Sequence, residues 1–145
     1  MQGFFHRLIA LHRPLVNALN ALLGEYGLSY SLWQVMLFLK TNGAATLVEM
    51  AEYYNIEKPS VTRRAQSLEE KQLIEVMVSE DRREKKIRLT SSGIELYNIC
   101  REKITELELR STASLSNDEK STLVEALPKV TQSILNEKRD NLNGK

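Results

Sequence analysis

The sequence predicts a mainly α-helical protein with one short β-hairpin, and three observations support this fold class. Apolar residues recur at helical spacing along most of the chain, and capping residues precede most of the helical segments. Two short alternating apolar runs enclose one charged turn, which is typical of a hairpin. A chain of 145 residues with 42% hydrophobic residues can form one domain with helical extensions. Its net charge of +1 does not by itself indicate a nucleic-acid partner.

The first helix is expected over residues 4–23, where apolar residues follow a helical period up to Gly24. Pro14 lies inside it and should kink it. Histidines and arginines interrupt the apolar pattern, so the segment resembles neither a signal peptide nor a membrane span. We therefore expect a cytoplasmic protein without a membrane partner.

The second helix is expected to begin at Ser31, because Ser31 and Gln34 have the spacing of a capping box, and to end at Gly43. This segment is apolar on nearly every side, which indicates a central buried helix.

Two short helices with a tight connection follow, the first after Thr46, whose spacing to Glu49 is again that of a capping box. Pro59 suits the first turn of the second helix, residues 58–71. In that helix Val61, Ala65 and Leu68 form the inner stripe, while the other side is polar. This arrangement is typical of a helix-turn-helix.

A hairpin should follow directly, because residues 73–78 alternate, with Ile74, Val76 and Val78 on one side, and Ile87 and Leu89 alternate again. The tip between them, residues 79–86, has the sequence SEDRREKK, in which every residue but the serine is charged. A helix-turn-helix followed by such a hairpin is a winged helix, so residues 31–90 are predicted to be a winged helix-turn-helix DNA-binding domain with a two-stranded β-wing.

Two long amphipathic helices should complete the chain, one over residues 91–114 capped by Thr90, and one from Ser116 to about Arg139. Ser116 and Glu119 have capping-box spacing, and Pro128 should bend the last helix. The first has the stripe Ile94, Tyr97, Cys100, Ile104 and Leu107. Because a small winged helix does not need such long apolar stripes, we expect residues 1–30 and 91–145 to be a helical dimerisation region.

Residues 27–93 resemble the MarR family of bacterial winged-helix transcriptional regulators, on the segments GLSYSLWQVM, TLVEMAEYYNIEKPSVTRRAQSLEEKQLI and SEDRREKKIRLTSSG. The resemblance implies a homodimer built from the terminal helices, a recognition helix in the major groove and a wing in the minor groove. It also implies release of DNA by a small molecule or an oxidant. Gln72 departs from the family by standing where glycine is usual, and Arg64 and Ser67 replace a usual apolar and a usual basic residue.

The predicted DNA-binding residues lie on the recognition helix and on the wing. Arg63 can pair bidentately with guanine and Gln66 with adenine. In the wing, Asp81 is expected to orient Arg83 for a narrow minor groove. Arg64 lies close to the inner stripe and is expected either to contact phosphate or to extend along the surface. The predicted residues are Ser60, Thr62, Arg63, Arg64, Gln66 and Ser67 in the helix, and Asp81, Arg82, Arg83 and Lys85 in the wing. The alternative is an ordinary solvated helix face and a charged turn.

A ligand pocket is a second candidate site, formed by His12, Arg13, Tyr26, Tyr30 and Trp33, although these aromatic residues could equally be core. The single cysteine, Cys100, lies on an apolar stripe, which favours a buried inert thiol over a redox sensor. No metal site is expected, since the histidines at 6 and 12 do not share a helical face. No catalytic motif or cofactor motif is present, so we do not expect an enzyme.

The sequence therefore predicts a dimeric, sequence-specific DNA-binding transcriptional regulator, and specifically a ligand-responsive repressor. Its partners would be an inverted-repeat operator, a second copy of the chain and a small-molecule effector. The alternative is a winged-helix module that binds another protein through the same face.

Overall fold

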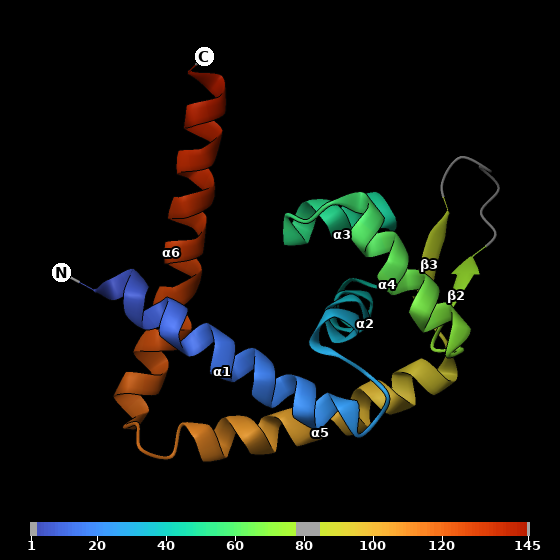
Figure 1. Cartoon of the computed structure of the whole chain (residues 1–145), viewed down its shortest axis with the longest axis horizontal. Helices are drawn as coiled ribbons and strands as arrows, with labels where there is room; N and C mark the ends of the chain where they lie inside the picture. The colour runs from blue at the N-terminus through green and yellow to red at the C-terminus, as the bar shows by residue number, and fades with distance from the viewer. Residues whose placement is uncertain (1–2, 78–84, 145) are drawn as a thin grey trace. The chain divides into compact units, whose positions relative to one another are not determined.

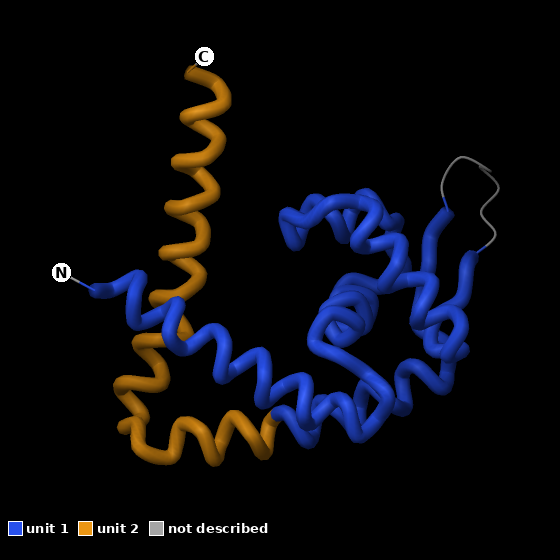
Figure 2. Tube along the Cα trace, in the orientation of Figure 1, with its two compact units in different colours: residues 1–104 blue, residues 105–145 orange. Residues whose placement is uncertain are grey.

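The computed structural model describes residues 3–77 and 85–144 (Figure 1). The predicted fold class is confirmed: the chain is mainly helical, with a small antiparallel sheet. It divides into two compact units, residues 1–104 and 105–145 (Figure 2). The elements are α1 (Phe4–Gly24), α2 (Tyr30–Asn42), β1 (Ala45–Thr46), α3 (Leu47–Tyr54), α4 (Lys58–Glu70), β2 (Ile74–Met77), β3 (Lys86–Leu89), α5 (Ser91–Ser111) and α6 (Asn117–Asn143).

The core of the first unit forms around α2, whose buried residues are Trp33, Val35, Met36, Phe38 and Leu39. This confirms the prediction of a central buried helix. The predicted inner stripe of α4 is also confirmed, because Val61, Ala65 and Leu68 are all buried. In α5, Tyr97, Cys100 and Ile104 complete the core, whereas Ile94 of the predicted stripe is 41% exposed.

The sheet has the strand order β1-β3-β2, and all its pairs are antiparallel. The predicted hairpin pairs Ile74 with Leu89 and Val76 with Ile87, and it buries Ile87 and Leu89 as expected. A third strand, β1, was not predicted and joins the sheet beside the predicted two-stranded hairpin. It pairs Ala45 with Ile87. A strand of two residues is too short to show an alternating pattern, so the sequence gives no sign of it. Strand β1 forms because the edge of β3 offers unpaired backbone groups.

The start of α2 also corrects the prediction. Ser29, not Ser31, is the cap: its backbone is extended and its Oγ accepts a hydrogen bond from the Leu32 N–H at 3.2 Å. At α3 the hydroxyl of Thr46 accepts from the N–H of Glu49 at 3.1 Å. The predicted capping box of Ser116 and Glu119 is present in full at the start of α6.

Three helices of the first unit end in the same Schellman motif, in which one residue adopts a left-handed conformation. These residues are Gly27 after α1, Asn55 after α3 and Gln72 after α4, with φ values of 73°, 53° and 62°. The 6→1 hydrogen bonds, all 3.0 Å long, run from Leu28 to Leu23, from Ile56 to Ala51 and from Leu73 to Leu68. Each motif turns the chain back so that the residue after it packs against the core.

The second unit contains the end of α5 and the whole of α6. Helix α5 ends at Ser111, three residues before the predicted end, and α6 continues to Asn143. No described residue of α6 is buried, although the helix carries several large apolar side chains. In the described ranges, no helix is long and apolar enough to cross a membrane.

Candidate nucleic-acid interface

Helix α4 presents a polar surface because its apolar stripe packs into the core on the opposite side. Pro59 lies in the first turn, where its missing N–H costs no hydrogen bond. Arg63 and Gln66 are exposed, while Ser60, Thr62 and Ser67 are half-buried. The two residues predicted to contact bases are therefore those most open to a ligand.

The hydroxyls of α4 are partly occupied within the helix. Thr62 Oγ1 donates to the Lys58 carbonyl at 3.0 Å, and Ser60 Oγ accepts from Arg63 Nη2 at 3.3 Å. The second bond is long, so it holds the guanidinium of Arg63 loosely and leaves most of its donors available. Gln66 is exposed and makes no side-chain hydrogen bond within residues 3–77 and 85–144.

Arg64 differs from its neighbours because its Nη1 donates to Gln34 Oε1 of α2 at 2.8 Å. Gln34 also donates through Nε2 to Tyr30 Oη at 3.0 Å, and its carbonyl accepts from Tyr54 Oη at 2.7 Å. Burial, with smaller contributions from the neighbouring tyrosines, raises the pKa of Tyr54 to about 12. Tyr54 therefore stays protonated and can donate at neutral pH. Sequence analysis missed this network because it joins residues far apart in the chain.

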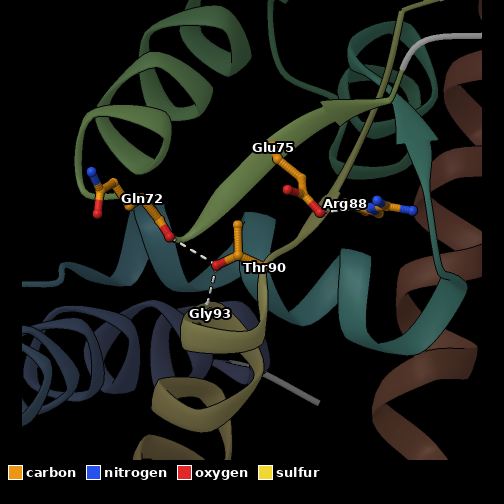
Figure 3. Close-up of polar contacts among 5 residues, drawn as sticks. All are labelled: Gln72, Glu75, Arg88, Thr90 and Gly93. Atoms are coloured by element: carbon orange, nitrogen blue, oxygen red, sulfur yellow. Dashed lines mark hydrogen bonds and ion pairs between the residues drawn. The ribbon is translucent and has the colours of Figure 1, made fainter.

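The wing is described only in part. Lys85 is exposed directly before β3, whereas Asp81, Arg82 and Arg83 lie outside the described residues, as does Val78. On the strands, Arg88 Nε lies 2.8 Å from Glu75 Oε1, in a cross-strand pair that the register places side by side (Figure 3). Both side chains are about half exposed, so the pair adds little stability, about 0–1 kcal/mol.

The junction from α4 through the wing to α5 depends on Thr90 (Figure 3). Its hydroxyl donates to the Gln72 carbonyl at 2.8 Å and accepts from the Gly93 N–H at 3.0 Å. Its own N–H donates to the Leu73 carbonyl at 3.0 Å. A Cβ on Gly93 would overlap that same Leu73 oxygen, so only glycine lets α5 approach this closely. The segment TSSG therefore ties the end of α4 to the start of α5.

The residues of the predicted ligand pocket lie in different environments. Trp33 is 4% exposed and stacks on Tyr97, with ring centroids 4.8 Å apart, so its indole belongs to the core. Tyr26 also packs against the core, Tyr30 is half-buried, and His12 and Arg13 are exposed on α1. The structure thus indicates that Trp33 is a core residue. A ligand pocket at the other four residues stays a prediction.

Cys100 is fully buried, and burial raises the pKa of its thiol. Since the thiolate is the reactive form, this environment suits an inert core residue. Among the described residues, no group of three or more histidine, cysteine or acidic side chains could hold a metal ion.

Comparison with known proteins shows that the chain is similar to transcriptional regulators. The MarR family model matches residues 28–85. The HTH-type transcriptional regulator YwoH of Bacillus subtilis is 31% identical over 115 residues, which cover 79% of this chain and 84% of YwoH. An HTH-type transcriptional regulator of Staphylococcus aureus strain Mu50 is 28% identical over 94% of this chain and 95% of its own length. The structure of Staphylococcus aureus MarR in complex with salicylate and kanamycin has a TM-score of 0.85 and 28% identity, covering 94% of this chain and 93% of that one.

Proposed function

The chain belongs to the MarR family of transcriptional regulators, and from this premise we propose that it is a homodimeric repressor that binds an inverted-repeat operator and releases it when a small molecule binds. The family consists of regulators and not of enzymes. The observation that carries the proposal is the exposed polar face of α4, where Arg63 and Gln66 are open to a ligand. An arginine and a glutamine in the first half of a recognition helix can pair with guanine and adenine in the major groove.

Ser60 and Ser67 would support this contact as half-buried hydroxyl donors at the edge of the same face, and Thr62 would do so once its hydroxyl leaves the Lys58 carbonyl. Such side chains commonly bind phosphate oxygens and so fix the position of a helix in the groove. Arg63 and Gln66 then supply the sequence preference. Arg64 is left out of this set because its guanidinium already binds Gln34.

The wing would enter the minor groove through residues 79–86, with Lys85 beside the phosphates and Arg83 in the groove. Ordering a long arginine side chain costs about 2 kcal/mol of conformational entropy. Asp81 would order Arg83 before DNA arrives, so that less of this cost falls on the binding step. A double-mutant cycle of operator affinity tests this. Asp81→Ala should weaken binding, Arg83→Ala should weaken it more, and the double variant should resemble Arg83→Ala. Tighter binding by Asp81→Ala would contradict the idea.

A homodimer is supported by large apolar side chains that remain substantially exposed on α1 and α6. On α1, Phe5, Ile9, Leu11 and Leu15 are 46–71% exposed. On α6, Leu123, Leu127 and Ile134 are 41–50% exposed, Val130 lies between the last two in the sequence, and Val124 is 73% exposed. Positions 123, 127, 130 and 134 follow the alternating spacing of a helix that packs lengthwise against another helix. A two-fold dimer presents two recognition helices, so its operator should have two half-sites about one helical turn apart.

A small-molecule effector is supported by the likeness to Staphylococcus aureus MarR, which was solved with salicylate and kanamycin. Salicylate is therefore the first compound to test. If it is an effector here, it should lower operator affinity, and by linkage operator DNA should lower the affinity for salicylate.

The test of the main proposal is DNA titration at two salt concentrations, using genomic fragments selected by binding and random duplexes. Counterion release should make affinity fall steeply with salt, and the selected fragments should bind more tightly than random DNA. Footprinting should show two protected half-sites. Weak binding to all DNA at both salt concentrations would instead indicate a module that binds another protein.

A further inference from the structure

The contact between Arg64 and Gln34 is possible in only one orientation of the Gln34 side-chain amide. A guanidinium carries only donors, so the atom that Arg64 Nη1 meets at 2.8 Å must be the amide oxygen of Gln34. This fixes the orientation of the amide and directs Nε2 to Tyr30 Oη, 3.0 Å away. Tyr30 is itself anchored, because its backbone N–H donates to Asn20 Oδ1 of α1 at 2.8 Å.

Gln34 also holds the other helix of the helix-turn-helix. Its carbonyl accepts the hydroxyl of Tyr54, which lies on α3, at 2.7 Å. The Tyr54 ring packs against Phe38, one turn further along α2, with centroids 6.1 Å apart. One residue of α2 therefore binds both α3 and α4, the first through its main chain and the second through its side chain.

The side chains of α4 that are buried in the core are apolar, namely Val61, Ala65 and Leu68. Apolar contacts are not directional, so they allow small rotations of a helix about its own axis. A hydrogen bond depends strongly on angle and resists such rotation. Arg64 is adjacent to Arg63 and two residues before Gln66, so a rotation of α4 would move both base-contacting side chains.

We propose that Gln34 and Arg64 are positioning residues that set the rotation of α4 for base recognition, and that Arg64 makes no phosphate contact. This inference rests on the proposed DNA-binding function. It separates Arg64 from Arg63, although both are arginines on the same helix, because Arg63 is exposed whereas Arg64 is half-buried and bound to α2.

The experiment compares Arg64→Met, Gln34→Met, the double variant and Arg64→Lys in the full chain. Methionine keeps the length and apolar contacts of both side chains but removes the hydrogen bond, and lysine keeps a donor for Gln34. Arg63→Met is the matched control on the exposed face. Affinity for operator and for random duplex is measured over a range of salt concentrations, and the melting temperature of each variant is recorded.

The expected result is that Arg64→Met and Gln34→Met each reduce the ratio of operator to random affinity by about fivefold to tenfold, which corresponds to the net contribution of one typical hydrogen bond. The double variant should lose no more than either single variant. The salt dependence should match that of the original chain, and Arg64→Lys should recover most of the discrimination. Amide hydrogen exchange in α4 without DNA should be faster in Gln34→Met.

The inference is overturned if Arg64→Met lowers affinity for both DNAs equally and reduces the slope of log affinity against log salt by about 0.9, as loss of one phosphate contact would. Additive losses with Gln34→Met, or unchanged discrimination, would overturn it too. Because Arg64 is outside the buried core, this slope can be measured even if Gln34→Met unfolds. If the original chain binds no DNA, the proposed function itself fails, and the exchange measurement still tests the coupling of Gln34 to α4.

Discussion

Replacing Gln72 by glycine should stabilise the protein. Gln72 has a φ of 62°, a left-handed conformation that costs a residue with a side chain about 1–2 kcal/mol. Glycine removes that cost but loses more conformational entropy on folding, about 0.5–1 kcal/mol. The Gln72 side chain is exposed, and Thr90 binds its carbonyl and not its side chain, so the substitution removes no side-chain hydrogen bond seen within residues 3–77 and 85–144. The net gain should be about 0.5–1 kcal/mol.

Urea unfolding at one fixed protein concentration measures this gain, since the proposed dimer would make stability depend on concentration. With a slope of about 2 kcal/mol per molar, the midpoint for Gln72→Gly should rise by roughly 0.3–0.5 M at an unchanged slope. Gly27→Gln is the reciprocal control. Gly27 has a φ of 73° in the same motif, and an added Cβ would meet only Lys71 Nζ within 4 Å, at 3.9 Å. The free energy of unfolding of Gly27→Gln should fall by about as much as that of Gln72→Gly rises.

An unchanged or lower midpoint for Gln72→Gly, together with the expected loss for Gly27→Gln, would refute the reasoning. It would mean that the glutamine side chain stabilises the folded state by as much free energy as the left-handed backbone conformation costs. A parallel Asn55→Gly variant should change the midpoint less, because asparagine tolerates the left-handed region better than glutamine.

Gly93→Ala should cost about 1–3 kcal/mol in urea unfolding, because its Cβ must displace the Leu73 carbonyl; an unaffected midpoint would show that α5 shifts freely. Arg63→Ala should lower affinity for operator by about 1–3 kcal/mol more than for random DNA, in a titration that compares the two; equal losses would make Arg63 a phosphate contact. Ile9→Glu and Val124→Glu, at positions 71% and 73% exposed, should each raise the dimer dissociation constant in sedimentation without unfolding the chain. An unchanged constant would place the interface elsewhere.

Deletion of residues 1–24 would be a poorer test of the dimer than these substitutions. Such a deletion removes Leu23, which is fully buried in the core of the first unit. Loss of solubility would then report a damaged core as readily as a lost interface. The structure therefore directs the test to the exposed residues of α1 and α6.

The buried side and the polar side of α4 could be predicted because they depend on local periodicity. The stripe of Val61, Ala65 and Leu68 determines which side of α4 is buried, and the polar side follows from it. The hairpin and its register follow in the same way from Ile87 and Leu89. These patterns need only a few neighbouring residues, so they are visible before the chain is folded.

The sequence by itself determined the helices, the hairpin and the inner face of each, because burial imposes a period on consecutive residues. Only the tertiary structure decided that Ser29 caps α2, that β1 joins the sheet, and that Arg64 binds Gln34, thirty residues earlier. A cap, a sheet edge or a hydrogen-bond partner is chosen by which groups meet in space. That choice depends on how distant elements pack, and no short window of residues contains it.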